Sequence, residues 1–569
     1  MLLKAFDYPQ LHIVYLLTLC LAHFFAFLGA RDFWETENHY AEITRVMLLE
    51  GDYWITRFNG SLWADNPPFY FWLTLLFSWA TGTVNEWTIR LPSALSATIL
   101  VLVFYLFSRK WFGRRIAFLA TVVLSTSVLT IHVERHIPIN STFFLWLTIS
   151  MFLFMEVVIS DSARLSHVYG AWFFLGLACL TKAPVSVLLP ASVIFLYLLF
   201  SRRGDKAAAL RPVSGSLFFL FVISPWFFFV IWKTSGDWVE HFFAQHHVWR
   251  TMSHGNPWYY SLAFFPVGFF PWVFLLPPAV MTLWRDCNPA RDAKLFFIFL
   301  WWLSVLVLAQ LFDGHHNHYL FFALLPASLG LGIFLDKLMY GSEDDRVLAW
   351  TKGSLIVGCG VIAICGVVLP LLAFYQLPEV KWHYTAFGVL AVAGAAWVFG
   401  ASRRRNYGAV VARLVILLLV VDLHIQGFIF PVYNDFQTRP VAERLGTIVK
   451  AGDGVAIFQS DPLDNYFNFY SGIKHIEHID SQEGLSEYLS RPGGRFLLVK
   501  QRKVETLQKS TDRNLTFVEF HQPSAKGWFS KSFPRWVLFY SCVSSCPPAW
   551  PPERLFSPYS PAHVRARND

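Results

Sequence analysis

The sequence predicts an all-α polytopic membrane protein followed by a small α/β domain outside the membrane. Three observations predict this class. Of the 569 residues, 55% are hydrophobic and 15% are charged, whereas soluble domains carry about 25% charged residues. Long apolar stretches recur from residue 11 to residue 431, and short apolar runs between polar segments replace them afterwards. This composition excludes a disordered protein, a coiled coil and a nucleic-acid-binding arm, and seven cysteines are too few for a disulfide scaffold.

About thirteen apolar stretches are long enough, or nearly so, to cross ~30 Å of hydrocarbon, which takes about 20 helical residues. The predicted spans are Leu11–Ala30, Trp87–Phe107, Ile116–Ile131, Ser141–Ile159, Val168–Leu180, Pro184–Phe200, Ser216–Trp232, Ser261–Leu283, Leu295–Phe312, Tyr319–Leu335, Ser354–Phe374, Tyr384–Gly400 and Ala409–Pro431. The first has no small-residue cleavage site before a hydrophilic domain, so we interpret it as a retained anchor rather than a signal peptide.

The basic residues predict how these spans are oriented. One set of short loops contains eighteen Lys and Arg residues, whereas the alternate loops contain eight over a longer sequence. Because basic loops stay in the cytoplasm, the amino terminus is predicted there and everything after Pro431 is predicted outside. This alternation requires Phe69–Thr81, which covers only about 20 Å as a helix, to lie at the outer interface as an amphipathic helix in the first outer loop, residues 31–86.

The sequence predicts three domains. Residues 1–431 form the membrane domain, residues 432–545 an exterior α/β domain, and residues 546–569 a disordered tail rich in Pro, Ser and Arg. Predicted strands at Val455–Phe458, Phe496–Val499, Phe517–Phe520 and Trp536–Tyr540 alternate with helical segments at Pro440–Lys450 and Val504–Ser510. Cys542 and Cys546 are equally compatible with a disulfide and with two free thiols.

Polar residues that neither anchoring nor orientation requires gather on the predicted outer side. They fall in the first outer loop, the second outer loop around residues 132–140, the end of the fifth span, the 233–260 loop and the 315–319 segment. One membrane face therefore collects carboxylates, imidazoles, a lysine and an arginine beside aromatic residues.

The order of these segments resembles the GT-C membrane glycosyltransferases, in particular the branch of aminoarabinose transferases and protein O-mannosyltransferases. The matching motifs are Tyr40-Ala41-Glu42-Ile43, Gly51-Asp52-Tyr53-Trp54, Pro67-Pro68 before an aromatic pair, Arg90-Leu91-Pro92-Ser93-Ala94, Leu180-Thr181-Lys182-Ala183-Pro184, Pro225-Trp226 and His254-Gly255-Asn256-Pro257-Trp258-Tyr259-Tyr260. Each motif is weak alone, but seven in family order over residues 30–330 are a strong signal.

The resemblance implies a GT-C fold and transfer of a sugar from a polyprenyl-phosphate carrier to a lipid, glycan or protein acceptor at the outer face of a bacterial inner membrane, as in lipopolysaccharide modification or protein glycosylation. A lipid phosphate is a stable leaving group, so its departure needs cations rather than a proton donor. One carboxylate that deprotonates the acceptor hydroxyl is then sufficient. No nucleic-acid partner is implied.

By position, the family's first-loop acidic pair falls on Thr36 and Glu37. We predict Glu37 as the catalytic base, with Glu35 as the alternative. A purely structural reading has Glu37 interacting with the helix dipole, worth about 0.3–1 kcal/mol. The family's Glu-Lys before Pro67 is replaced by Asp65-Asn66, and its acid in the second outer loop is replaced by Asn140, which also suits a helix cap.

The remaining candidates are cations and imidazoles expected at the lipid phosphate. Lys182 and Arg250 are the predicted phosphate contacts, although Lys182 also suits a side chain that extends to the headgroups. The predicted substrate-binding residues are Asp65, Asn66, Asn140, Lys182, Arg250, His254, Tyr259, His315 and His318. The resemblance also implies a divalent metal ion on Asp65 and His254, which alone are far from a closed ligand set.

Two alternative functions remain open. A transporter or flippase of lipid-linked sugars predicts midplane charges, broken helices and internal repeats. A catalytically altered relative would explain why Thr36, Asn66 and Asn140 all depart from the family pattern. A rewired site for a different donor or acceptor explains the same substitutions, and we favour it.

Overall fold

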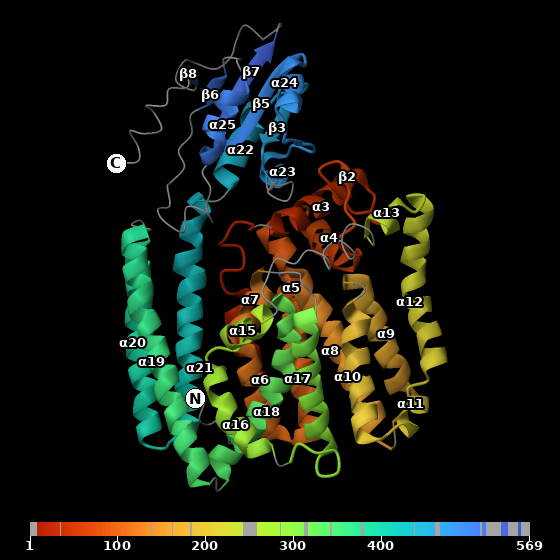
Figure 1. Cartoon of the computed structure of the whole chain (residues 1–569), viewed down its shortest axis with the longest axis vertical. Coiled ribbons are helices and arrows are strands. Elements are labelled where there is room, and N and C mark those ends of the chain that lie inside the picture. The colour runs from red at the N-terminus through yellow and green to blue at the C-terminus, as the bar shows by residue number, and fades with distance from the viewer. Residues whose placement is uncertain are drawn as a thin grey trace.

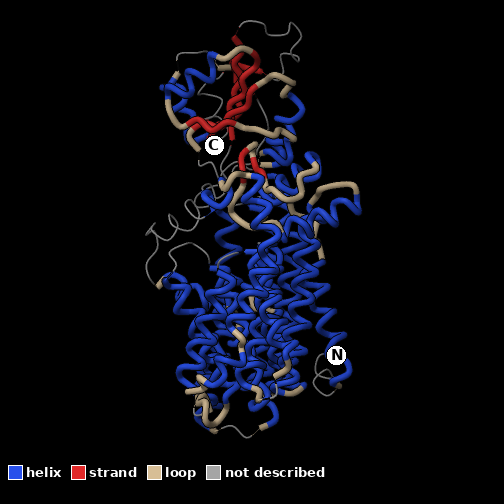
Figure 2. Tube along the Cα trace, turned by 90° about the vertical axis from the view of Figure 1, so that its right-hand side faces the viewer, coloured by secondary structure: helices blue, strands red, loops and turns tan. Residues whose placement is uncertain are grey.

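The computed structural model of the chain divides into a bundle of long helices and a smaller α/β domain at one end (Figure 1). Figure 2 shows that the strands gather at that end. The structure describes residues 8–34, 36–136, 138–161, 163–182, 185–242, 259–284, 286–311, 317–341, 344–376, 380–436, 438–460, 467–511, 515–518, 536–543 and 556–558. We call residues 439–558 the C-terminal domain.

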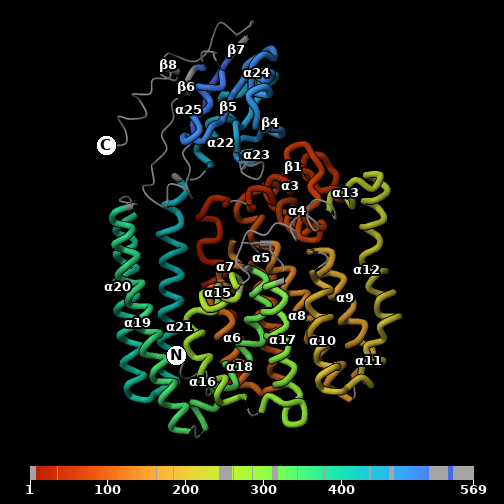
Figure 3. Tube along the Cα trace, in the orientation of Figure 1, coloured from red at the N-terminus to blue at the C-terminus, as the bar shows by residue number. Residues whose placement is uncertain are grey.

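In the described part of the chain, eight helices are long and apolar enough to cross a membrane, or up to 10 if each of two bent helix pairs is one span. The thirteen spans therefore stay a prediction. The bundle contains α2 (His12–Cys20), α5 (Glu86–Phe112), α6 (Arg114–Ser125), α7 (Val128–His136), α8 (Pro138–Ile159), α9 (Leu165–Lys182), α10 (Val185–Ser201), α11 (Asp205–Ala209), α12 (Pro212–Lys233), α13 (Asp237–Glu240), α15 (Tyr260–Gly268), α16 (Leu276–Leu283), α17 (Ala293–Leu311), α18 (Phe321–Tyr340), α19 (Asp345–Gln376), α20 (Lys381–Arg403) and α21 (Tyr407–His424). Figure 3 shows α9–α12 and α19–α21 on opposite flanks.

Two of the predicted spans are not straight helices. The stretch Ile116–Ile131 is divided between α6 and α7, which are bent by 60°. The hydroxyls of Thr126 and Ser127 donate to backbone carbonyls one turn earlier, at 2.6 and 2.7 Å, a bonding pattern that bends helices. The stretch Ser261–Leu283 is divided between α15 and α16, with a bend of 106° near Pro271, which has no backbone N–H to continue a helix.

The first loop lies between the bundle and the C-terminal domain (Figure 1). It contains α3 (Thr36–Glu50), the short antiparallel pair β1 (Arg57–Phe58) and β2 (Ser61–Leu62), and α4 (Phe69–Thr81). The helix predicted over Phe69–Thr81 is therefore confirmed as α4. It begins after Pro68 and ends at Gly82, whose φ of 71° is the left-handed conformation that terminates helices.

The first and last helices of the bundle are joined by a buried pair. Nδ1 of His23, in the short π-helix η2 (Leu21–Phe25), lies 2.8 Å from Oδ2 of Asp422 in α21. Arg135 of α7 donates to the backbone carbonyls of His23 and Ala26. These carbonyls lie at a helix end, where they have no intrahelical partner. Polar contacts thus fix the residues from which the first loop starts.

The C-terminal domain contains one mixed sheet of six described strands, in the order β4-β3-β5-β7-β6-β8. The strands are β3 (Gly454–Phe458), β4 (Glu477–Ile479), β5 (Gly493–Lys500), β6 (Thr516–Val518), β7 (Trp536–Val543) and β8 (Phe556–Pro558). β3 is parallel to β4 and β5, whereas β7 and β6 are antiparallel to their neighbours. The strands predicted at Val455–Phe458, Phe496–Val499 and Trp536–Tyr540 are present within β3, β5 and β7, and the described part of Phe517–Phe520 lies in β6. β8 lies within the stretch predicted to be disordered. Cys546 lies outside the described residues, so its pairing with Cys542 stays untested.

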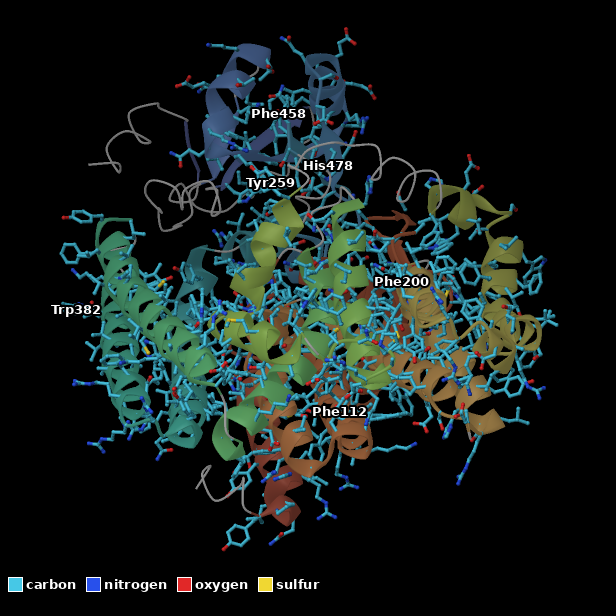
Figure 4. The ribbon with its side chains drawn as sticks, turned by 60° about the horizontal axis from the view of Figure 1, so that its bottom comes forward. Phe112, Phe200, Tyr259, Trp382, Phe458 and His478 are labelled. Carbon is cyan, nitrogen blue, oxygen red and sulfur yellow. The ribbon has the colours of Figure 1, made fainter. Side chains whose placement is uncertain are left out.

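Helices cover both faces of this sheet. Alternate strand residues pack against α22 (Arg439–Ile448) and α23 (Asn468–Ser471) on one side, and against α24 (Gln482–Ser490) and α25 (Val504–Ser510) on the other. The predicted helical segments at Pro440–Lys450 and Val504–Ser510 correspond to α22 and α25. The sticks in Figure 4 show Phe458 in this domain, Phe112 in the bundle and Trp382 on the outer side of the bundle.

Candidate functional site

Lys182 lies at the centre of a polar cluster built from three separate elements. Its Nζ donates to Oδ1 of Asn140 at 2.9 Å and lies 3.0 Å from Nε2 of His318. The ammonium also lies 4.8 Å from the ring centroid of Tyr319. We call Lys182, Asn140, His318 and Tyr319 the Lys182 cluster.

The fold explains how residues distant in sequence meet there. Asn140 is in the first turn of α8, Lys182 is the last residue of α9, and His318 is in the short helix η5 (Asn317–Leu320) before α18. Asn140 and Lys182 meet because α8 and α9 are antiparallel neighbours. Neither Asn140 nor an imidazole nitrogen that accepts a hydrogen bond carries a negative charge, so these two contacts orient the ammonium through hydrogen bonds rather than ion pairs.

Glu37 lies in a second cluster, in which both of its carboxylate oxygens accept hydrogen bonds. Arg90 donates to both carboxylate oxygens, with Nε to Oε1 at 2.8 Å and Nη2 to Oε2 at 3.0 Å, and Arg31 donates to Oε2 at 2.7 Å. The backbone N–H of Trp34 also donates to Oε2 at 3.0 Å. Glu37 is 0% exposed. We call Glu37, Arg31 and Arg90 the Glu37 cluster.

The electrostatics of this cluster favour an ionised carboxylate. Burial raises the pKa of Glu37, but the guanidinium groups of Arg31 and Arg90 outweigh burial and leave that pKa below its ordinary value of 4.5. A carboxylate with a low pKa and with both oxygens engaged is a weak proton acceptor. The base role of Glu37 stays a prediction, and its contacts are those of a residue that holds two cations in place.

Arg90 is a residue of this cluster that was not among the predicted site residues. Besides binding Glu37, it donates to the carbonyls of Leu28, Arg31 and Asp32. It therefore ties the start of the first loop to α5. The available signal was an arginine inside an apolar helix, since such a residue is costly in a membrane and needs specific partners.

Asp65 and Asn66 contact each other, with Nδ2 of Asn66 donating to Oδ2 of Asp65 at 2.8 Å. Asn66 is buried and Asp65 is partly exposed. The described residues contain no group of three or more His, Cys, Asp or Glu that could hold a metal ion, and His254 lies outside them. The metal prediction thus has one described ligand, and we route no chemical step through a metal.

The other predicted residues are placed as follows. Glu35, Arg250, His254 and His315 lie outside the described residues. Tyr259 directly precedes α15 and is 51% exposed, and Figure 4 shows it at the end of the bundle that faces the C-terminal domain. Thr36, at the other position of the family's acidic pair, is exposed.

Comparisons with known proteins support the predicted resemblance. Residues 65–232 match the family described as dolichyl-phosphate-mannose-protein mannosyltransferase. The chain is 28% identical over 413 residues, 69% of its length and 73% of the relative's, to an undecaprenyl phosphate-α-4-amino-4-deoxy-L-arabinose arabinosyl transferase of Edwardsiella ictaluri. It is also 28% identical over 372 residues, covering 63% and 65% of the two chains, to the protein of that name from Pseudomonas aeruginosa strain PAO1.

Two solved structures share the fold. The crystal structure of ArnT from Cupriavidus metallidurans bound to undecaprenyl phosphate superposes with a TM-score of 0.74 at 19% identity and covers 94% of this chain and 99% of that one. The Archaeoglobus fulgidus oligosaccharyltransferase in the apo form gives 0.52 at 10% identity and covers 91% and 74%.

The fold is that of the GT-C membrane glycosyltransferases, and the sequence similarities are to glycosyltransferases. Within that class, the predicted resemblance to the aminoarabinose transferases and protein O-mannosyltransferases is confirmed.

Proposed function

We propose that this protein transfers an amino-pentose from a polyprenyl-phosphate carrier to a lipid acceptor at the outer face of a bacterial inner membrane. The observation that carries this proposal is the Lys182 cluster, in which an amide oxygen and an imidazole nitrogen from two other helical segments contact the Lys182 ammonium. The printed names of the relatives support both the carrier and the sugar. The amino terminus would be cytoplasmic, as the basic loops predict.

The reaction needs one bond to break and one to form. The acceptor hydroxyl attacks the anomeric carbon of the sugar, and the bond from that carbon to the phosphate oxygen breaks. Polyprenyl phosphate leaves with the electron pair, and the hydroxyl proton passes to a base. Lys182 stabilises the negative charge that develops on the phosphate, while Asn140 and His318 hold its ammonium in position.

The base must be a carboxylate that can accept a proton. Glu37 and Glu35 are the predicted candidates, and the contacts of Glu37 favour a structural role for that residue. Asp65 is partly exposed and is predicted to bind substrate. We therefore propose that Glu35 and Asp65 be tested beside Glu37 as proton acceptors.

A reconstituted transfer assay tests the function. Purified protein in vesicles receives labelled polyprenyl phosphate that carries either a 4-amino-pentose or a hexose, together with a glycolipid or a peptide acceptor. We expect label on the glycolipid from the amino-pentose donor. Transfer from the hexose donor or to the peptide would overturn the substrate assignment. Movement of the donor across the membrane without any transfer would establish the flippase alternative instead.

Substitutions then assign the base. Glu35→Gln, Glu37→Gln and Asp65→Asn are compared at saturating donor across a range of pH. Removal of the base should abolish the limb of the pH–rate profile that reports its ionisation, whereas removal of a structural carboxylate should lower the rate and leave the profile unchanged. We expect the second result for Glu37→Gln.

A further inference from the structure

The C-terminal domain contacts the start of the first loop through side chains that reach across the domain boundary. Arg439, the first residue of α22, places Nη1 2.7 Å from Oδ1 of Asp32 and 3.3 Å from Oε1 of Glu86. Its Nε lies 2.7 Å from Oε1 of Glu443, within the same helix. One arginine thus joins the first loop, the start of α5 and the C-terminal domain.

Tyr470 forms a second bridge beside the first. Its hydroxyl accepts the backbone N–H of Phe33 at 2.8 Å and donates to Oε1 of Glu86 at 2.8 Å. The guanidinium of Arg439 lies 5.0 Å from the centroid of the Tyr470 ring. Burial and the nearby Glu86 and Asp32 carboxylates raise the pKa of Tyr470, so the hydroxyl keeps its proton and stays a donor to Glu86.

Two asparagines extend the interface. Oδ1 of Asn434, just before α22, accepts the backbone N–H of Asp32 at 3.0 Å, and its Nδ2 donates to the carbonyl of Ala30 at 3.1 Å. Farther along the first loop, Oδ1 of Asn59 accepts the backbone N–H of Ile476 at 2.7 Å, and its Nδ2 donates to the carbonyl of the same residue at 2.9 Å. The loop is therefore bound at two places.

The segment held in this way is also the one that Arg90 holds from the opposite side. Arg90 binds the carbonyls of Leu28, Arg31 and Asp32, while Arg439, Tyr470 and Asn434 bind Asp32 and Phe33. The described residues of the segment 28–37 thus lie between the bundle and the C-terminal domain. They lead directly into α3, where the family's acidic pair falls.

We propose that Arg439 and Tyr470 are positioning residues of the glycosyltransferase, through which the C-terminal domain fixes residues 28–37 and the start of α3 over the bundle. This inference rests on the proposed function. A small displacement of groups at a reacting centre costs much rate, so loosening this segment lowers turnover even though neither residue touches the substrate.

The test uses the full-length protein in vesicles and two readouts. Transfer kinetics give kcat and the donor KM, and hydrogen exchange reports the protection of backbone amides in residues 28–37. We expect Arg439→Ala to lower kcat about tenfold or more while the donor KM stays within about twofold, and to raise exchange in that segment. Arg439→Lys should recover part of the rate because it keeps the charge opposite Asp32.

Matched controls come from the same domain. Arg491 pairs only within the C-terminal domain in the described part of the chain, with Glu477 and Glu487, and the Tyr488 hydroxyl donates to the carbonyl of Phe496. Arg491→Ala and Tyr488→Phe should leave kcat and the exchange of residues 28–37 unchanged. Tyr470→Phe, which keeps the ring and loses both hydrogen bonds, should lower kcat severalfold.

Three results would separate the proposals. Wild-type kcat and exchange in Arg439→Ala would overturn the positioning role while the transferase stands. An equal loss in Arg491→Ala would also overturn it, because general damage to the domain would then explain the effect. An inactive wild-type protein would overturn the proposed function, and the exchange of residues 28–37 would still decide whether Arg439 fixes the segment.

Discussion

The Glu37 cluster and the Lys182 cluster represent two ways to hold a charge in one membrane protein. In the Glu37 cluster a buried carboxylate binds two guanidinium groups and one backbone N–H. In the Lys182 cluster the cation contacts an amide oxygen and an imidazole nitrogen. The Glu37 cluster thus pairs one negative charge with two positive ones, whereas the Asn140 and His318 contacts of Lys182 are with groups that carry no negative charge.

This difference favours a structural role for the Glu37 cluster and supports the proposed substrate-binding role of the Lys182 cluster. A buried ion pair that loses one member leaves an uncompensated charge, which is strongly destabilising. A lysine oriented by neutral groups keeps its attraction for a phosphate. We therefore expect substitutions in the Glu37 cluster to affect folding first, and substitutions in the Lys182 cluster to affect the reaction first.

The largest effect is expected from Glu37→Gln, because it leaves Arg31 and Arg90 buried without a negative partner. The free energy of unfolding should fall by about 3–5 kcal/mol. Thermal unfolding in detergent measures it. Glu487→Gln removes an exposed pair with Arg491 and should cost less than about 1 kcal/mol. Equal losses in the two variants would contradict a structural role for the Glu37 cluster.

Lys182→Ala should lower kcat/KM by about 10²–10³-fold, the loss typical when one donor to a developing negative charge is removed. The melting temperature of Lys182→Ala should stay close to that of the wild type, in contrast to the loss of stability expected for Glu37→Gln. Lys233 is an exposed lysine in the last turn of α12, and Lys233→Ala should keep full activity. A similar loss in Lys233→Ala would favour a role in headgroup contact for both lysines.

Asn140→Asp places a carboxylate beside Lys182 and makes the Lys182 cluster resemble the Glu37 cluster. Because the new charge would neutralise the ammonium, we expect the KM for the polyprenyl-phosphate donor to rise about tenfold. Asn140→Ala removes the 2.9 Å contact without adding charge and should have a smaller effect on this KM. A lower KM in Asn140→Asp would show that Lys182 does not meet the donor phosphate.

Much of the fold was predictable from the sequence, because hydropathy and alternation report burial directly. The helix Phe69–Thr81 and the strand Val455–Phe458 follow from such patterns and are present as α4 and β3. The bend between α6 and α7 was not predictable in this way. It depends on side-chain bonds from Thr126 and Ser127 to the backbone, and a hydropathy window does not detect them.

The candidate site shows the same limit. The resemblance selected Asn140, Lys182 and His318 one by one, but their contacts depend on how α8, α9 and η5 pack. It also selected Glu37 for catalysis. Arg90, which donates to both carboxylate oxygens of Glu37, is 53 residues away in sequence, so the motif around Glu37 does not reveal these contacts. A sequence motif identifies the residue type, whereas the free or occupied state of its oxygens is a property of tertiary structure.

The smallest expected effect is the pH dependence of stability that arises from the Glu37 carboxyl. The folded-state pKa of Glu37 lies below its ordinary value of 4.5, so its contribution to stability is complete above that value and is lost as pH falls through the lowered pKa. Burial raises the pKa of Asp32 and of Glu42 despite their arginine partners, so these two carboxyls shift stability in the opposite direction. The pH dependence of the total free energy of unfolding therefore combines contributions from Glu37, Asp32 and Glu42.

The difference between wild type and Glu37→Gln isolates the one term of interest. We expect the two proteins to differ most in unfolding free energy at pH 7, and the difference to shrink as pH is lowered below 4.5. Thermal unfolding at a series of pH values measures this difference. A constant difference for Glu37→Gln would mean that its carboxyl is not ionised between the two arginines.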